Sequence, residues 1–212
     1  MYALITDGSI AKYLSGNRGI TIGSIQFPQN IFTLWTAAEK EAIGIYEVIQ
    51  NNAKKKDEKY YTNTNQTFTY DADAGTVTAT YGDATAKAHA DTTWTQADSD
   101  NGLLPSDKSV GDVKVEGLKT KKIRAVKKQA ANILADTDWY IVRKADAETA
   151  VPSAITTFRA AVRTKCAAME TAITNASDTP AIETLYTYVN TADEGDPVVM
   201  ERPLGEFPVV GS

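Results

Sequence analysis

Leu134-Ala135-Asp136-Thr137-Asp138-Trp139 is the stretch that decides the fold, because it lies where a β-rich first half gives way to a helical second half. Apolar residues recur at helical spacing before it and after Val151-Pro152. The second run predicts a helix of roughly 20 residues that begins at Pro152 and packs along a partner helix. We expect a helical hairpin with the indole of Trp139 buried between the helices and Arg159 and Arg163 on the outer face. The apolar positions are Ile123, Val126, Ala130 and Leu134, then Ile155, Phe158, Val162, Cys166, Met169 and Ile173.

The composition is that of a folded, mildly acidic protein. Of the 212 residues, 42% are hydrophobic and 23% are charged, which argues against wholesale disorder. The net charge of -5 argues against general nucleic-acid binding, which favours a basic balance. No apolar run approaches the roughly 20 residues of a membrane span, and the first residues lack a signal-peptide pattern. One cysteine, Cys166, excludes an internal disulfide framework.

The first half predicts a small β-rich domain over residues 1–95 with one short helix. Asp7-Gly8 indicates a two-residue hairpin turn between two short strands, and residues 19–27 alternate as a single strand would. Thr36 and Glu39 form a capping-box pattern that begins the short helix, and Gly44 ends it before a strand at 45–49. A second hairpin is expected from residues 66–70 and 76–81.

The second half predicts three further segments. Residues 96–117 are polar with scattered glycines and are interpreted as a linker. Residues 118–190 form the helical-hairpin domain, with residues 139–152 as its connection and a short third helix that begins at Pro180. Residues 191–212 are proline-rich and are expected to be an extended C-terminal tail. The predicted fold class is therefore α+β.

No catalytic, cofactor or metal site can be named from the sequence. His89 is the only histidine and has no Ser or Cys motif beside it, so a loop histidine is expected. Cys166 lies on the apolar stripe and is interpreted as a small buried hydrophobe. The runs at 71–75 and 98–102 resemble the start of a calcium loop, but their glycine comes one position early and no ligand Glu follows. They are interpreted as a hairpin turn and as part of the linker.

One locally basic cluster stands out before the central stretch. A solvated helix face is the default interpretation, because interleaved aromatics or a glycine-rich clamp for nucleic acid are lacking. Docking against an acidic protein partner is the alternative. The cluster consists of Lys119, Lys121, Lys122, Arg124, Lys127 and Lys128.

The second half resembles the tail assembly chaperone and tail-fibre accessory protein family of tailed bacteriophages. The resemblance rests on Leu134, Asp138-Trp139, Val151-Pro152 and a helix with an aromatic-Arg-x-x-aliphatic-Arg pattern at 158–163. The first half resembles tail-fibre accessory proteins through Asp7-Gly8, the Thr-x-x-Glu helix at 36–39 and Gly44-Ile45-Tyr46.

The resemblance implies a non-enzymatic tail or tail-fibre component that binds other phage tail proteins, possesses no cofactor, and resides in the virion tail after synthesis in the host cytoplasm. An assembly chaperone absent from the virion is the alternative, and self-association stays open. A third possibility is a carbohydrate-binding module, which predicts exposed coplanar rings among Tyr60, Tyr61, Phe68, Tyr70 and Tyr81. The expected partner-binding residues are Trp139, Phe158, Arg159, Arg163, Lys121, Arg124, Lys128, Arg202 and Phe207. For Trp139 and Phe158 a structural role within the helical hairpin is favoured over docking, whereas the polar arginines favour docking.

Overall fold

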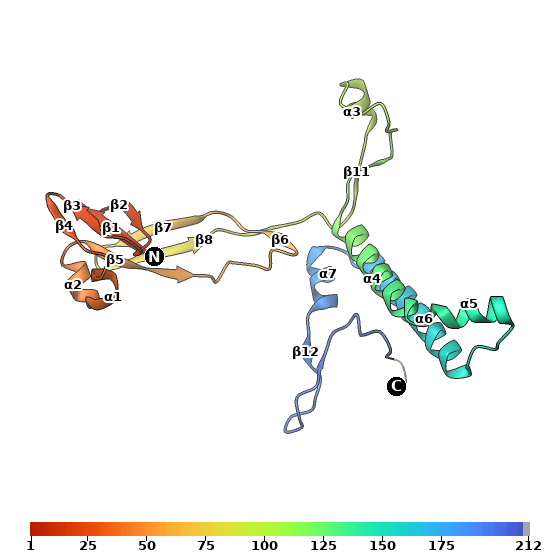
Figure 1. The fold of residues 1–212 in the computed structure, drawn as a ribbon. Coiled ribbons are helices and arrows are strands. Elements are labelled where there is room, and N and C mark those ends of the chain that lie inside the picture. Colours follow the sequence, from red (N-terminus) through yellow and green to blue (C-terminus); the bar gives the residue numbers. More distant parts are fainter. Residues whose placement is uncertain (210–212) are drawn as a thin grey trace. The chain divides into compact units, whose positions relative to one another are not determined.

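The computed structural model describes residues 1–209 and divides into two compact units, Met1–Thr85 and a second unit that begins at Ala86 (Figure 1). The first unit is rich in strands and the second carries the long helices, so the chain belongs to the α+β class. The division into units comes ten residues before the predicted domain boundary after residue 95.

A five-stranded sheet forms the first unit. Its strands are ordered β2 (Ser9–Leu14), β1 (Tyr2–Thr6), β5 (Ile45–Asn51), β8 (Thr76–Tyr81) and β7 (Gln66–Asp71). All neighbours are antiparallel except β5 and β8, which pair parallel. Both predicted hairpins, β1–β2 and β7–β8, are confirmed.

The first hairpin turns at the two residues that the sequence indicates. Asp7 and Gly8 have φ angles of 52° and 73°, the left-handed values that a two-residue hairpin turn requires. The predicted strand at 19–27 is wrong. It is divided into β3 (Ile20–Ile22) and β4 (Ile25–Phe27), which form a second hairpin because Gly23 at φ 60° permits a tight turn.

Two short helices follow, α1 (Ile31–Leu34) and α2 (Ala37–Glu41). The capping box at α2 is confirmed: the Glu39 backbone N–H donates to Thr36 Oγ1, and the Thr36 N–H donates to the Glu39 carboxylate. The hydrogen bonds that the Thr36 N–H and hydroxyl donate to the Glu39 carboxylate lower the pKa of that carboxyl. Gly44 has φ 78°, so the expected left-handed stop before β5 is also confirmed.

The sheet has an apolar cluster on each face because consecutive residues of a strand point to opposite sides. On β1, Leu4 belongs to the cluster with Ile31, Phe32 and Ile45, whereas Ala3 belongs to the cluster with Val48, Val77 and Ala79. Two further short strands, β6 (Tyr61–Thr62) and β9 (Thr85–Ala86), pair with each other.

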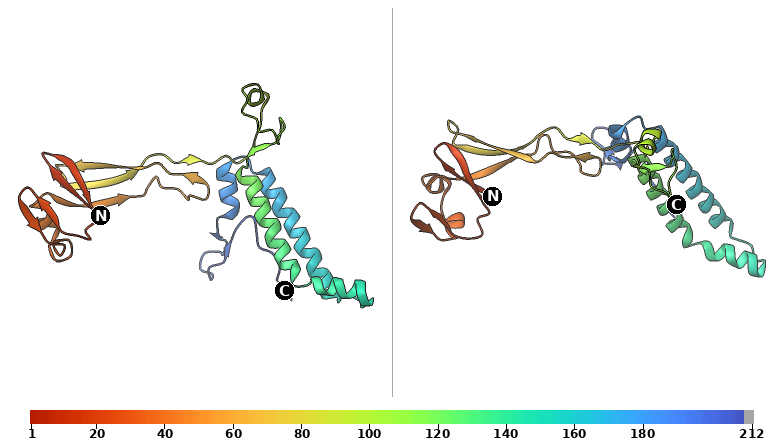
Figure 2. Two further views of the ribbon diagram at one scale, coloured as in Figure 1. Left: turned by 45° about the horizontal axis from the view of Figure 1, so that its top comes forward. Right: turned by 90° about the horizontal axis from the view of Figure 1, so that it is seen from above.

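Three helices make the core of the second unit. These are α4 (Leu118–Ala135), α6 (Ser153–Asn175) and α7 (Thr179–Tyr186), and α4 and α6 run side by side in both views of Figure 2. The predicted long helix and the predicted third helix are therefore confirmed. The expected connection at 139–152 contains another helix, α5 (Asp138–Ala147), because no proline interrupts residues 138–147.

The periodic apolar residues of α4 and α6 form the core of this unit, as their spacing predicts. Val126 and Ala130 of α4 face Phe158, Val162, Met169 and Ile173 of α6. Leu204 and Phe207, from the C-terminal segment, are buried in the same cluster, and the Leu204 N–H donates to Leu185 O at 3.0 Å. Apolar residues of the tail thus complete the helical core.

The predicted linker at 96–117 is wrong, because this segment is folded within the second unit. It holds α3 (Gln96–Asp100) and β11 (Val113–Val115), which pairs with β10 (Thr92–Thr93). Thr95 and Asp98 cap α3 reciprocally, so the run that resembles a calcium loop is a helix. Lys114 Nζ lies 2.6 Å from Asp98 Oδ1 and 4.4 Å from the centre of the Trp94 ring, which joins α3 to the hairpin.

The tail is not fully extended. Two short strands, β12 (Val189–Asn190) and β13 (Met200–Glu201), form a hairpin before the chain returns to the helices. The Thr191 N–H donates to Val199 O at 2.8 Å, and the Asn190 side chain accepts from two backbone N–H groups. These bonds close a loop that the three prolines of this segment do not reveal in the sequence.

Candidate protein-docking surfaces

The junction of α4 and α5 is locked by Arg159. This arginine lies on α6 with 7% of its surface exposed, and its Nη1 donates to Leu134 O at 2.8 Å and to Thr137 Oγ1 at 2.6 Å. Its Nη2 pairs with Asp138 Oδ1 at 2.8 Å. The guanidinium therefore satisfies a carbonyl at the end of α4 and binds the first residue of α5.

Trp139 does not lie between the helices, which corrects the prediction. Its side chain is 50% exposed, its ring lies 3.8 Å from that of Tyr140, and the Arg143 guanidinium lies 4.7 Å from its centre. The predicted outer position of Arg159 is also wrong. A planar cation with five donors meets the carbonyls of a helix end better than an indole with one, so the arginine occupies the interior.

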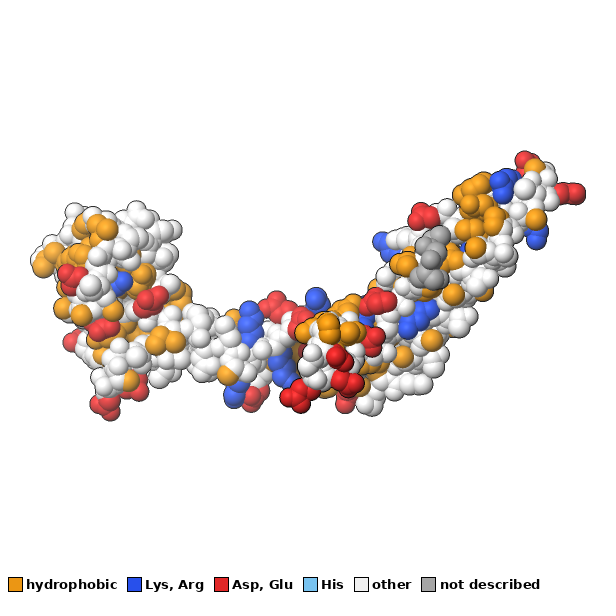
Figure 3. All heavy atoms as spheres, turned by 90° about the horizontal axis from the view of Figure 1, so that it is seen from below, with side chains coloured by type: hydrophobic (Ala, Val, Ile, Leu, Met, Phe, Trp, Pro, Cys, Tyr) orange, Lys and Arg blue, Asp and Glu red, His pale blue; other side chains and the backbone are white. Residues whose placement is uncertain are grey.

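The helix α5 presents an apolar surface that nothing in the described residues covers. None of its residues is buried, and Ile141 and Val142 are 43% and 65% exposed in addition to Trp139. Figure 3 shows hydrophobic side chains gathered at this end of the second unit. Trp139, Tyr140, Ile141, Val142 and Arg143 are consecutive and surround one turn of the helix, with Tyr140 and Arg143 half-buried and the other three exposed; we call these five residues the α5 face. Aromatic rings with an arginine are the residue types that anchor protein interfaces.

The remaining predicted residues of α6 differ in their positions. Phe158 is buried in the helical core, as expected for a structural role. Arg163 is exposed and has no hydrogen bond or ion pair among residues 1–209. Of Phe158 and Arg163, only Arg163 therefore lies where a partner could reach it.

Four members of the predicted basic cluster of α4 are exposed, namely Lys121, Arg124, Lys127 and Lys128, whereas Lys119 and Lys122 are half-buried. Arg124 pairs with Glu116, which lowers the pKa of the Glu116 carboxyl and raises that of the guanidinium. Lys127 pairs with Glu170 at 3.0 Å. Lys121 and Lys128 have no ion pair within the described part of the chain. Because Lys121, Arg124 and Lys128 recur at helical spacing, they form one line, which we call the basic stripe.

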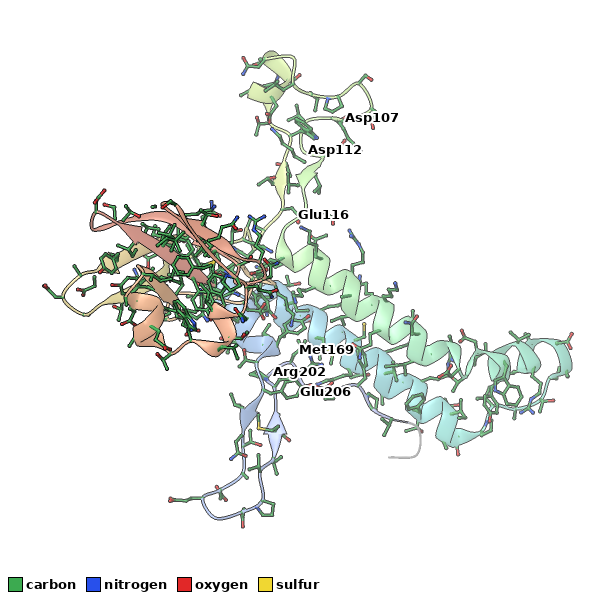
Figure 4. All side chains as sticks on the ribbon, turned by 60° about the vertical axis from the view of Figure 1, so that its left-hand side comes forward. Asp107, Asp112, Glu116, Met169, Arg202 and Glu206 are labelled. Carbon is green, nitrogen blue, oxygen red and sulfur yellow. The ribbon has the colours of Figure 1, made fainter. Side chains whose placement is uncertain are left out.

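Arg202 and Phe207 are engaged within the chain, which corrects their prediction as docking residues. Phe207 is buried in the helical core. Arg202 is part-buried and pairs with Glu206 at 2.7 Å, beside α6 in Figure 4. Tyr188 also donates to Glu206, which raises the pKa of the Tyr188 hydroxyl. The segment expected to lie along a neighbour lies on its own helices instead.

The sequence reasoning missed the hairpin β12–β13 as a surface. Val198, Val199 and Met200 are 70%, 47% and 53% exposed, and Tyr188 and Val189 are about half exposed. The same hairpin carries Asp193, Glu194, Asp196 and Glu201 and no basic residue between 188 and 201. The absence of Lys and Arg from a 14-residue apolar and acidic run is the signal that could have revealed it.

A separate anchor fixes the start of α4. Asp91 accepts from the Gly117 N–H at 2.6 Å and from Thr120 Oγ1 at 2.8 Å, and these bonds lower the pKa of its carboxyl. A side chain at Gly117 would meet the Ala90 carbonyl at 2.4 Å, so glycine is required there. The carbonyls of Ala88 and His89 accept the next two N–H groups. Both carboxylate oxygens of Asp91 therefore accept hydrogen bonds from residues at the start of α4, which is a structural role.

The candidate chemical groups do not converge. Among residues 1–209, no three His, Cys, Asp or Glu side chains lie together as metal ligands would. Cys166 is part-buried and near Glu170, and burial raises the pKa of its thiol. A hollow of about 650 Å³ beside β2 and β3 is lined by Lys12, Arg18 and the Gly16–Gly19 loop, without an acid–base pair.

The rings proposed for carbohydrate binding do not form one platform. Tyr60 and Tyr61 are buried, and Phe68 and Tyr70 stack on other rings at angles of 47° to Tyr13 and 58° to Tyr46. Tyr70 shares a hydrogen bond with Tyr46, which raises the pKa of the Tyr46 hydroxyl. Coplanar exposed rings are thus not found among these residues.

No protein-family profile, curated protein or solved structure matches the chain. Among the described residues, no helix is long and apolar enough to cross a membrane. The fold and surfaces define the class: a two-unit α+β protein whose second unit projects an apolar helix and an acidic hairpin.

Proposed function

We propose that the protein is a non-enzymatic bacteriophage tail-associated protein, a structural tail or tail-fibre component that acts through protein–protein contacts. The observation that carries the proposal is the α5 face, an uncovered aromatic and aliphatic surface on a helix held in place by a buried arginine. The family resemblance supplies the phage context.

Several residues that carry the family resemblance lie together at the junction of α4 and α5. Arg159 donates to Leu134 O and pairs with Asp138, and Phe158 is buried in the same helical core as Leu134. This lock fixes where α5 begins, and α5 in turn presents Trp139 outward. A rigid support under an exposed tryptophan lowers the entropy that binding would otherwise cost. The partner proposed for this face is another tail protein of the same phage.

Substitution of Trp139 tests the docking role. We expect Trp139→Ala to weaken binding to co-purifying tail proteins by about 30-fold, the effect of losing a 2 kcal/mol interface anchor. Its own fold should be retained, because half of the side chain is already in solvent. Lys144→Ala on the same helix is the matched control. Equal binding of both variants and the wild type would remove the α5 face as the docking site.

The place of action requires a second experiment. Stoichiometric recovery of the chain in purified phage particles supports the structural component. Recovery only from infected-cell lysate, bound to an unassembled tail protein, supports the alternative, an assembly chaperone absent from the virion. Recovery in neither fraction together with unimpaired particle assembly after deletion of the gene would reject both roles.

A further inference from the structure

The hairpin β12–β13 is too small to be stable unless other residues pack against it. Each strand has two residues, and isolated two-stranded hairpins are marginal in water unless something packs on them. Its aliphatic side chains Val189, Val198, Val199 and Met200 nevertheless lie in solvent. In Figure 3, which looks onto the hairpin, hydrophobic and acidic side chains lie together on it. Such a surface is typical of an interface that is covered in an assembly.

The negative charge of this hairpin indicates that a basic surface covers it. Residues 188–201 hold four acids and no base, and none of Asp193, Glu194, Asp196 and Glu201 forms an ion pair within the described residues. The Asp196 N–H donates to Asp193 O, so the three tip acids share one turn. A partner must therefore supply cations spaced over one turn.

The second unit itself contains a surface with these properties. Residues 118–135 of α4 hold six bases and no acid. Lys121 and Lys128 have no ion pair within residues 1–209, and seven helical residues place their Cα atoms about 10 Å apart. Ala125 lies between these two lysines and Ala131 lies beyond Lys128; both are exposed, and their short side chains do not project above the basic stripe. The basic stripe is thus complementary to the acidic tip in charge.

We propose that a second copy of this chain covers the hairpin, with the acidic hairpin of one copy docked on the basic stripe of α4 of the next. Contact within one copy is disfavoured, because Arg202 and Tyr188 bind Glu206 and fix the base of the hairpin. In Figure 1 the hairpin and α4 point in different directions from α7. The two surfaces differ, so two copies can pair them reciprocally in a closed dimer, or successive copies can pair them head to tail in a ring or an open chain. This inference does not depend on the proposed function.

Reciprocal charge reversal tests the contact. The tip variant carries Asp193→Lys, Glu194→Lys and Asp196→Lys, and the stripe variant carries Lys121→Glu and Lys128→Glu. All five side chains are exposed, and circular dichroism of each variant verifies the helices. The mass distribution of the full-length chain is measured by sedimentation velocity across concentration and salt.

The wild type is expected to self-associate, and high salt should weaken the association. Each variant alone should raise the dissociation constant at least about tenfold, because like charges then face each other. An equimolar mixture should restore assembly, because each reversed surface finds its opposite on the other variant. Lys12→Glu with Arg18→Glu, in the first unit, makes the same charge change as the stripe variant and should leave association unchanged.

Three results would overturn the proposal. The wild type could remain monomeric at every concentration and salt, the tip variant could assemble as the wild type does, or the mixture could stay monomeric although both variants are folded. Binding of the hairpin only to a different basic protein would appear as the first of these results.

Discussion

Removing the guanidinium of Arg159 should unlock the junction of α4 and α5. In Arg159→Ala, Leu134 O and Thr137 Oγ1 lose donors at 2.8 and 2.6 Å in a buried site. Hydrogen bonds from a charged donor contribute about 1.5 kcal/mol each at the low end, so the two together give about 3 kcal/mol. The pair with Asp138 adds less than about 1 kcal/mol, because that carboxylate is 58% exposed.

The assay is thermal and urea unfolding followed by circular dichroism at the helical minimum, which reports mainly on the second unit because it holds all the long helices. A loss of about 3 kcal/mol lowers the Tm of a unit of this size by about 10 °C. Arg163→Ala is the matched control, since Arg163 is exposed four residues further along the same helix. A shift within about 0.5 kcal/mol of this control would refute the lock.

Three further outcomes follow from individual side chains. Lys114 and the Thr95 cap lower the pKa of Asp98 to about 2, below its unfolded value of 3.8. The stability that Asp98 contributes to the β10–β11 hairpin is therefore present above pH 4 and is lost as the pH falls towards 2. Titration of the carboxyl group by NMR checks this pKa. Gly44→Ala places a Cβ 2.7 Å from Ile5 O at a φ of 78° and should destabilise the first unit by about 2 kcal/mol. Gly23→Ala, whose Cβ meets no atom within 4 Å, should destabilise it by about 1 kcal/mol. Hydrogen exchange of the β1 and β5 amides measures both changes. The thiol of Cys166, whose pKa burial raises, should react with a disulfide reagent at pH 8 more slowly than after unfolding in urea.

The sequence predicted those elements whose signals are local. The hairpin at Asp7-Gly8, the capping box at Thr36 and the apolar period of α6 each depend on residues within one or two turns of chain. All three are confirmed, because no distant contact opposes the local preference. The class α+β follows from them.

The prediction failed where distant residues decide the structure. Lys114 and Asp98 are 16 residues apart, and Lys114 joins Asp98 to the Trp94 ring in a segment whose composition is that of a linker. Arg159 takes the interior in place of Trp139, because its acceptors Leu134 O and Thr137 Oγ1 become available only where α4 ends at Ala135. Phe207 of the tail enters the core because α4, α6 and α7 leave a space for it. None of these contacts has a periodic signature.

The parallel pairing of β5 with β8 has a consequence for the order of events on the ribosome. The hairpins β1–β2 and β7–β8 form from neighbouring residues, but Val48 meets Val77 only after the intervening strands have been synthesised. Non-local parallel pairing is a slow step in folding. The sheet is nevertheless complete at Tyr81, before the first residue of α4 is translated. All five strands of the sheet are therefore available for pairing before the basic and acidic surfaces of the second unit exist, and the growing chain cannot associate through those surfaces until both are made.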